Sequence, residues 1–491
     1  MSPTLIIGII AAYFCILIFI SFLTGRNTDS QTFFLANKQS PWYIVAFGMI
    51  GTSLSGVTFI SIPGTVATNS FSYLQLVLGY LLGYLVIATI LMPLYYKLNL
   101  VSIYTYLEKR FGYWSYKTGA FFFILSRTIG AALRLYVVAG VLQLAVFDAL
   151  GVPFWLSVLI TVLLIWVYTF RGGMKTIIWT DTFQTLAMLI CVGTSIVLIS
   201  SELNLSFDGM VNTITESKYS QTFFWDAKDS KYFLKQFFSG AFITIVMTGL
   251  DQDMMQKNLS CKNIGEAQKN MFWFSVILVL VNVFFLALGA LLYIYADTKG
   301  IQLPAKGDDV FPFLALKHFN ILASVTFIVG IVAITYASAD SALTALTTSF
   351  CVDFLDFAHR DEHQRVRLRY MVHLGFSFML MLVIMIFRAI NDQSVIAAVF
   401  KVAGYTYGPL LGLYAFGLFT KRHLRDKWVP LICVVCPILT YITNANSKEW
   451  LFGYEFGFEI LMLNGFLTFM GLWFISKKHP EDVVALMPVA S

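Results

Sequence analysis

The sequence predicts an all-α polytopic membrane protein with about thirteen transmembrane helices and a core of two inverted five-helix repeats. Hydrophobic residues make up 58% of the 491 residues and charged residues only 12%, about half the charged share of soluble domains. A water-soluble fold could not bury this much apolar surface, and the chain is too rich in Phe, Tyr and Trp to be disordered. The number of helices and the repeat follow from long apolar runs and from their spacing.

Thirteen apolar segments are long enough to cross a bilayer, which takes about 20 residues in a helix. The first is not expected to be a cleaved leader, because no basic residue precedes it and no cleavage site follows it. The six cysteines are scattered, mostly inside apolar segments, which argues against a disulfide framework. The segments are 4–24, 42–69, 72–97, 116–147, 151–170, 180–201, 232–256, 272–296, 320–355, 366–390, 394–419, 428–444 and 455–476.

The distribution of Lys and Arg predicts the orientation. If the N-terminus is outside, most of the 33 Lys and Arg, Lys257 among them, fall in inner loops. Inner loops of membrane proteins carry such an excess. We therefore expect a multi-pass protein of the plasma membrane, which in a bacterium is the inner membrane, with a cytoplasmic C-terminus. The net charge of +6 is part of this pattern and does not indicate a nucleic-acid partner.

Segments two to six and segments seven to eleven begin at matching intervals. Because five is odd, the second set must enter from the opposite side, which is the inverted repeat of many secondary transporters. Segments two and seven, the first of each set, both contain glycines, which favours broken helices with free carbonyls. Glycine can also serve only the packing of helices against each other. The predicted parts are an extra helix and inner loop at 1–41, a first repeat at 42–201, an outer loop at 202–231, a second repeat at 232–419, two extra helices at 420–476 and a cytoplasmic tail at 477–491.

Five motifs carry a resemblance to a known family. They are FGMIGTSLSGVTFISIPG at 47–64, WTDTFQ at 179–184, GLDQDMMQK at 249–257, ASADSALTAL at 337–346 and GYTYGPLLG at 404–412. Over about residues 25–425 the chain resembles the sodium/solute symporter family, which includes sodium–glucose, sodium–proline and sodium–sialic acid cotransporters. The resemblance implies a leucine-transporter-like fold and sodium-coupled import of a small polar organic solute by alternating access. The motifs do not specify whether the solute is a sugar, a sugar acid or another organic acid.

The resemblance implies a sodium site between segments two and nine. Sodium is a small hard cation that takes oxygen ligands, as calcium does. The family builds the site from carbonyls of the broken helix and from oxygens of segment nine. The matching positions are the carbonyls of Gly51, Leu54 and Ile334 and the hydroxyl of Ser338. The alternative for Ser338 is a hydrogen bond to the backbone of its own helix.

Two acidic residues lie within or beside apolar segments, where an ionised carboxylate is costly and usually functional. Some members of the resembled family bind a second sodium with a carboxylate matching Asp181 and with hydroxyls matching Ser341 and the position of Asp340. We therefore expect these three residues to form a second cation site. The alternative is that Asp181 caps its helix near Thr180 and that Asp340 pairs with a nearby basic group.

Two arginines stand inside segment four. Arg127 and Arg134 are seven residues apart and therefore share a helix face. Buried arginine prefers a carboxylate or phosphate partner that accepts two hydrogen bonds. A sialic acid transporter of the resembled family uses an arginine of the equivalent helix for the carboxylate of its solute, which implies an anionic solute here. The alternative is an ion pair with a carboxylate of the protein.

Polar residues surround the expected break in segment two. The resemblance implies that they face the solute and that the aromatic residue among them closes the outer side. Hydroxyl and amide groups suit sugars and hydroxy acids, although they can also form hydrogen bonds between helices, worth ~0.6–2 kcal/mol each. These residues are Thr52, Ser53, Ser55, Thr58, Phe71 and Gln75.

We expect a transporter and not an enzyme, since the sequence contains neither a clustered catalytic set nor a phosphate-binding loop. The expected coupling ion is Na+, and the expected partners are the solute and membrane lipid, with no nucleic acid and a monomeric state. A membrane sensor or an ion channel on the same scaffold is the alternative function. A sensor would need an attached signalling domain, and only a short segment follows residue 476.

Overall fold

The computed structural model describes residues 3–24, 34–355, 360–390 and 395–477, except for the side chains of 168–172. Within these ranges the chain is almost entirely helical, apart from loops and the two-residue strands β1 (His423–Leu424) and β2 (Ser476–Lys477), which pair antiparallel. The α-helices are α1 (Pro3–Thr24), α3 (Trp42–Asn69), α4 (Tyr73–Val86), α5 (Met92–Lys97), α6 (Thr105–Arg110), α7 (Tyr113–Leu142), α8 (Phe154–Glu202), α9 (Phe207–Thr215), α10 (Phe233–Thr244), α11 (Gln252–Leu259), α12 (Ile264–Lys299), α13 (Val310–Lys317), α14 (Ile321–Phe354), α15 (Glu362–Ile390), α16 (Val395–Thr406), α17 (Gly408–Phe419), α18 (Val429–Ala445), α19 (Ser447–Trp450) and α20 (Ile460–Ile475).

Nine helices of the described ranges are long and apolar enough to cross a membrane, and two bent pairs raise the number to eleven. The bent pairs are α10 with α11, which meet at 65°, and α16 with α17, which meet at 46°. Two shorter apolar helices, Phe154–Val167 and Ile460–Ile475, fall on predicted segments 151–170 and 455–476. The prediction of an all-helical, multi-span membrane protein is therefore confirmed, with a helix at each predicted segment.

The long helix α8 contains two spans that meet at Gly173. This residue has φ 54° and ψ −150°, which are not helical values. Glycine enters this region without a steric penalty because it has no Cβ. The break separates the predicted segments 151–170 and 180–201.

The helix α3 is interrupted at Ser55, whose φ of 50° and ψ of 167° leave the helical region. A non-glycine residue in such a conformation costs about 1–3 kcal/mol and persists only where its surroundings hold it. Gly56, the next residue, packs so closely on α14 that a Cβ there would overlap Thr335 Oγ1. An interruption of this kind can free carbonyls of the preceding turn for another ligand.

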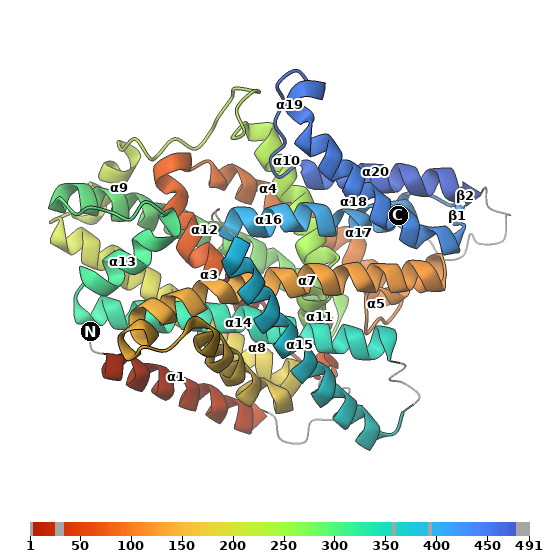
Figure 1. Cartoon of the computed structure of the whole chain (residues 1–491), viewed down its shortest axis with the longest axis horizontal. Helices are drawn as coiled ribbons and strands as arrows, with labels where there is room; N and C mark the ends of the chain where they lie inside the picture. Colours follow the sequence, from red (N-terminus) through yellow and green to blue (C-terminus); the bar gives the residue numbers. More distant parts are fainter. Residues whose placement is uncertain (1–2, 25–33, 356–359, 391–394, 478–491) are drawn as a thin grey trace.

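The helix α14 forms the centre of the molecule and is buried continuously from residue 330 to residue 349. It packs against α3, α7 and α8, and Figure 1 shows α3, α7 and α14 in the middle and α1 at the lower edge. The most apolar stretch of α3 is 83% buried, whereas that of α15 and of α18 is only 22% buried. The outer helices therefore present apolar side chains to lipid, and the polar residues of α3 and α14 face other helices.

Candidate ion and solute site

A cavity lies beside the break in α3 and is lined by residues of α3, α4, α7, α10, α11, α12 and α16 and of the turn after α10. Its volume is about 70 Å³, which is small beside the ~300–1,000 Å³ of sites for drug-sized ligands. A solute the size of a sugar would have to move side chains to enter. The lining residues are Thr52, Ser53, Leu54, Ser55, Val57, Thr58, Tyr73, Tyr80, Tyr84, Arg127, Arg134, Ile243, Thr244, Met247, Thr248, Met254, Leu278, Asn282, Ile396, Val399 and Phe400.

The structure brings four of the predicted solute-facing residues, Thr52, Ser53, Ser55 and Thr58, together with both arginines, to this cavity. Two other predicted residues do not line it. Gln75 is fully buried, where its amide donates to the Lys231 carbonyl at 2.9 Å and accepts from the Phe224 amide at 3.2 Å. The Phe71 amide likewise donates to the Gln221 carbonyl at 3.0 Å.

The Gln75 side chain and the Phe71 backbone therefore hold the loop before α10 against the start of α4. For the Gln75 side chain this placement differs from the expected contact with solute. An amide that faces solute and an amide that anchors a loop look alike in one sequence, so the distinction required the positions of the loop carbonyls.

The predicted residues of the first sodium site lie where α3 and α14 approach each other. An added Cβ at Gly51 would be in ordinary contact with Ile334 Cδ1 of α14 at 3.5 Å, and it would overlap Thr185 Oγ1 of α8, so the glycine favours the close approach of α3 to α8. Ser338 is fully buried, and its hydroxyl oxygen accepts a hydrogen bond from Arg134 Nη1 at 3.2 Å. Neutral carbonyl and hydroxyl oxygens beside a helix break fit a sodium ion, and the Ser338 oxygen keeps a second lone pair for it.

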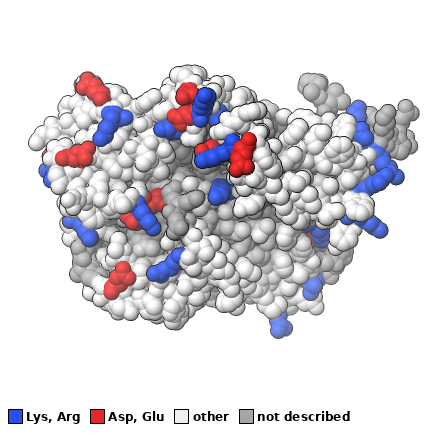
Figure 2. Space-filling model, turned by 45° about the horizontal axis from the view of Figure 1, so that its top comes forward, with Lys and Arg blue, Asp and Glu red and all other residues white. Residues whose placement is uncertain are grey.

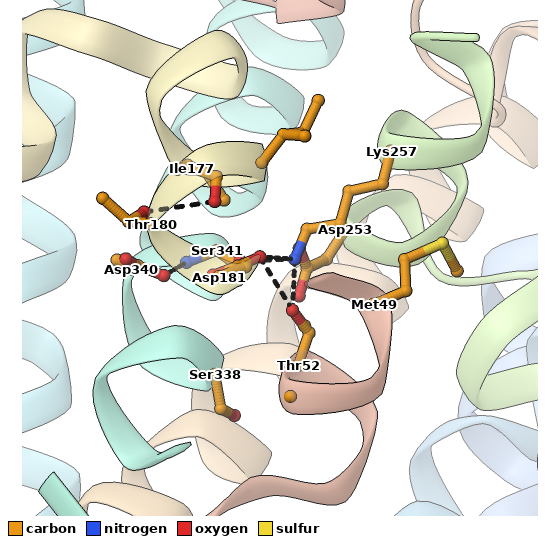
Figure 3. A network of polar contacts seen from close by, with 12 residues as sticks. Met49, Thr52, Ile177, Thr180, Asp181, Asp253, Lys257, Ser338, Asp340 and Ser341 are labelled. Carbon is orange, nitrogen blue, oxygen red and sulfur yellow. Dashed lines mark hydrogen bonds and ion pairs between the residues drawn. The ribbon is translucent and has the colours of Figure 1, made fainter. Parts of the chain in front are cut away.

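A lysine lies among the residues predicted for the second cation site. Lys257 of α11 is 1% exposed, and its Nζ is 2.5 Å from Asp181 Oδ2 and 2.7 Å from Ser341 Oγ. It also bonds to Thr52 Oγ1, which donates to Asp181 Oδ2 at 3.0 Å. Figure 3 shows the four side chains converging from α11, α8, α14 and α3 on one point.

Asp340 does not reach that point. Its Oδ1 accepts a hydrogen bond from the Ser341 amide at 2.5 Å, and Figure 3 shows its carboxylate on the side of Ser341 away from Lys257. The structure thus brings Asp181 and Ser341 together and leaves Asp340 to one side.

The position of Lys257 differs from the inner loop to which the charge distribution assigned it. The helix is interrupted at residues 250–251, between α10 and α11. The polar residues of α11 are buried in the core. Lys257 follows Asp253 by four residues and Gly249 by eight. The bend itself agrees with the break that the glycines of segment 232–256 predict. The closely spaced charges that follow Gly249 were the signal that α11 is buried in the core.

Arg127 forms an ion pair with the protein itself. Its guanidinium contacts Asp253 Oδ2 and lies 3.9 Å from Asp251 Oδ2. The hydroxyl of Tyr407, at the bend between α16 and α17, donates to the same Asp251 oxygen at 2.6 Å. This is the alternative left open for Arg127 by the sequence.

Arg134 is in a different situation, although it lies two turns along the same helix. It is 8% exposed and lines the cavity. Its hydrogen bond goes to the neutral Ser338 hydroxyl, and no carboxylate of the described residues lies within 4.0 Å of it. A buried guanidinium in this setting is suited to an anionic ligand.

A multi-span bundle with broken helices, a buried polar cavity and charges at the level of the breaks defines a secondary transporter. Residues 33–426 match the model of the sodium:solute symporter family. This chain therefore belongs to the sodium:solute symporter family and is a sodium-coupled solute symporter, not an enzyme.

Known proteins show the same relationship along most of the chain. A sodium/sialic acid symporter of Aliivibrio fischeri is 25% identical over 464 residues, covering 91% of this chain and 89% of that protein. One of Proteus mirabilis is 25% identical over 449 residues, covering 88% of each. The human sodium-coupled monocarboxylate transporter 2 is 23% identical over 82% of this chain and 65% of its own length.

Two solved structures support the fold. A substrate-bound, outward-open Na+-coupled sialic acid symporter superposes with a TM-score of 0.80 at 19% identity, covering 96% of this chain and 99% of that one. The transporter Mhp1, of the nucleobase-cation-symport-1 family, gives a TM-score of 0.53 at 12% identity, covering 90% and 94%. The predicted leucine-transporter-like fold is therefore confirmed.

Proposed function

We propose that this symporter imports a small organic anion, a sugar acid or another organic acid, whose carboxylate binds Arg134. The observation that carries the proposal is a buried guanidinium that lines the cavity with no carboxylate partner among the described residues. Ser53 and Thr58 line the same cavity and supply hydroxyl groups for the rest of a polyhydroxy solute. Thr52 lines it as well, but its hydroxyl is bound to Asp181 and Lys257. Relatives that are named as sialic acid and monocarboxylate transporters agree with an anionic solute.

We propose that the coupling sodium ion binds the carbonyls of Gly51, Leu54 and Ile334 and the hydroxyl of Ser338. Arg134 donates to the same hydroxyl, so a sodium ion there and the guanidinium would repel each other. A solute carboxylate beside Arg134 reduces this repulsion, and each ligand then increases the affinity for the other. The linked binding closes the site before the bundle opens to the other side.

We further propose a monomer in the bacterial inner membrane, with its N-terminus outside, its C-terminus in the cytoplasm and no nucleic-acid partner. Figure 2 shows mostly Lys and Arg at the right-hand end, where Figure 1 places β1 and β2, and both signs of charge toward the left-hand end. This asymmetry agrees with positive inner loops. The interruptions in α3 and between α10 and α11 support the proposed repeats at 42–201 and 232–419.

Arg134→Gln is expected to abolish the stabilisation of the purified protein by anionic solutes. A solute at 100 times its Kd stabilises the wild type by about 2.7 kcal/mol, and the effect should require both the carboxylate and sodium. The measurement is a thermal-shift screen of sugar acids, monocarboxylates and matching neutral sugars, in sodium and in choline. Arg388→Gln, at an exposed arginine of α15, is the control. Equal stabilisation by a neutral sugar in wild type and Arg134→Gln would refute the proposal.

Ser338→Ala is expected to raise the sodium concentration needed for half-maximal uptake about tenfold, equivalent to ~1.4 kcal/mol. The substitution removes one sodium ligand and leaves the buried helix intact. Ser324→Ala in the same helix is the control, because that hydroxyl bonds to the Ala315 and Asn320 carbonyls. Sodium dependence of uptake is measured in proteoliposomes. An unchanged value in Ser338→Ala would exclude this hydroxyl as a ligand.

A further inference from the structure

The ammonium group of Lys257 is coordinated as a bound cation would be. An ammonium has three N–H donors, and three oxygens surround this one: Asp181 Oδ2, Ser341 Oγ and Thr52 Oγ1. These oxygens come from α8, α14 and α3, and all three side chains are buried. Two of the three residues are ones that the sequence assigns to a second cation site.

We propose that Lys257 is a tethered cation that takes the place of a second sodium ion, so that this symporter couples to one sodium per cycle. The ammonium supplies the positive charge that Asp181 needs inside the membrane. It is covalently part of the protein, whereas a sodium ion would have to bind from solution. The proposal concerns the ion stoichiometry and rests on the sodium coupling of the family. It does not depend on the identity of the solute.

The geometry makes the ammonium and a second sodium mutually exclusive. A sodium ion bound to Asp181 Oδ2 and Ser341 Oγ would sit at the position of the lysine Nζ, which is 2.5 and 2.7 Å from those atoms. Two positive charges at contact distance in a buried site repel strongly, because little water screens them. Two other carboxylates lie nearby: that of Asp253 is already paired with Arg127, and that of Asp340 accepts from the Ser341 amide on the side of Ser341 away from Lys257.

The tether also fixes which helices the cation connects. A free sodium ion leaves once per cycle, whereas the ammonium of Lys257 stays attached to α11. In this structure it joins α11 to α3, α8 and α14 through single side-chain contacts. The attraction between Asp181 and its cation is therefore present at every sodium concentration, and sodium controls only the site beside Ser338.

The experiment counts sodium ions bound to the purified full-length protein by equilibrium binding of radioactive sodium, with no solute added. The wild type is expected to bind one ion with a Hill coefficient of one. Lys257→Ala frees the oxygens of Asp181 and Ser341 and leaves room for an ion, so it should bind two ions. Lys257→Arg keeps a tethered charge, and Lys257→Ala with Asp181→Asn removes the carboxylate; both should bind one.

Thermal melting in sodium and in choline provides a second readout. Sodium should restore more stability to Lys257→Ala than to the wild type, because only the variant gains a second ion. Two ions in the wild type would overturn the proposal even if Lys257→Ala failed to fold. A folded Lys257→Ala that binds one ion would overturn it as well. Because no solute is present, these results stand apart from any failure of the anion to bind at Arg134.

Discussion

Gly240→Ala is expected to prevent normal packing of α10 on α4 and to cause a large loss of stability. A Cβ at Gly240 would overlap the carbonyl oxygen of Leu76 and lie 2.9 Å from the carbonyl carbon. The reciprocal contact is equally close, since a Cβ at Gly79 would overlap the Phe237 oxygen. Backbone atoms cannot rotate away as a side chain can, so we expect about 3 kcal/mol or more, the upper end of overpacking effects.

The measurement for Gly240→Ala is the melting temperature and the monodisperse yield in detergent. Gly130→Ala in α7 is the matched control, because an added Cβ there meets nothing within 4 Å. Alanine has the higher helix propensity, by about 1 kcal/mol, so this control should melt at or above the wild type. If Gly240→Ala melted like Gly130→Ala, the close approach of α4 and α10 would be wrong.

Arg127→Leu is expected to destabilise the protein by about 3–5 kcal/mol, the range found when one partner of a buried ion pair is removed. The substitution leaves the Asp253 carboxylate buried with no positive charge in contact. Replacing both partners, Arg127→Leu with Asp253→Leu, should recover part of the loss, because the Asp253 carboxylate is then no longer buried unpaired, while Asp251, 3.9 Å from Arg127, still loses its cation. Melting temperatures of the two single variants and the double variant measure the coupling.

The same variants separate a structural role of Arg127 from a role in solute binding. If Arg127 only pairs with Asp253, the double variant should still be stabilised by the anionic solute. If the single variant melts like the wild type, the ion pair contributes nothing and the assignment is wrong. Arg134→Gln should show the opposite behaviour, with normal melting and no effect of solute.

The spans and the break in α3 could be predicted from the sequence because both depend on local composition. Apolar runs of about 20 residues fix the spans. The glycines around Ser55 indicate the region of the break. Because Thr52, Ser53 and Thr58 are close to it in sequence, their place beside the cavity could be predicted as well. For this part of the molecule, sequence neighbours are also spatial neighbours.

The partners of the charged groups could not be predicted in the same way. Asp181 and Lys257 are 76 residues apart, and their contact depends on how α11 returns into the core after its bend. A count of charges treats a lysine as the end of a span, so it assigned Lys257 to an inner loop, whereas Lys257 is buried in α11. Arg127 and Arg134 share a helix face, and only the position of Asp253 distinguishes them.

The hydrogen bond between Tyr407 and Asp251 has a mechanical consequence. Tyr407 lies at the bend between α16 and α17, and Asp251 lies at the bend between α10 and α11. One 2.6 Å hydrogen bond thus links these two bends. A change in the angle of one bend that moved Tyr407 away from Asp251 would have to break this bond, at a cost of about 1.5–3 kcal/mol, so the two bends are energetically coupled.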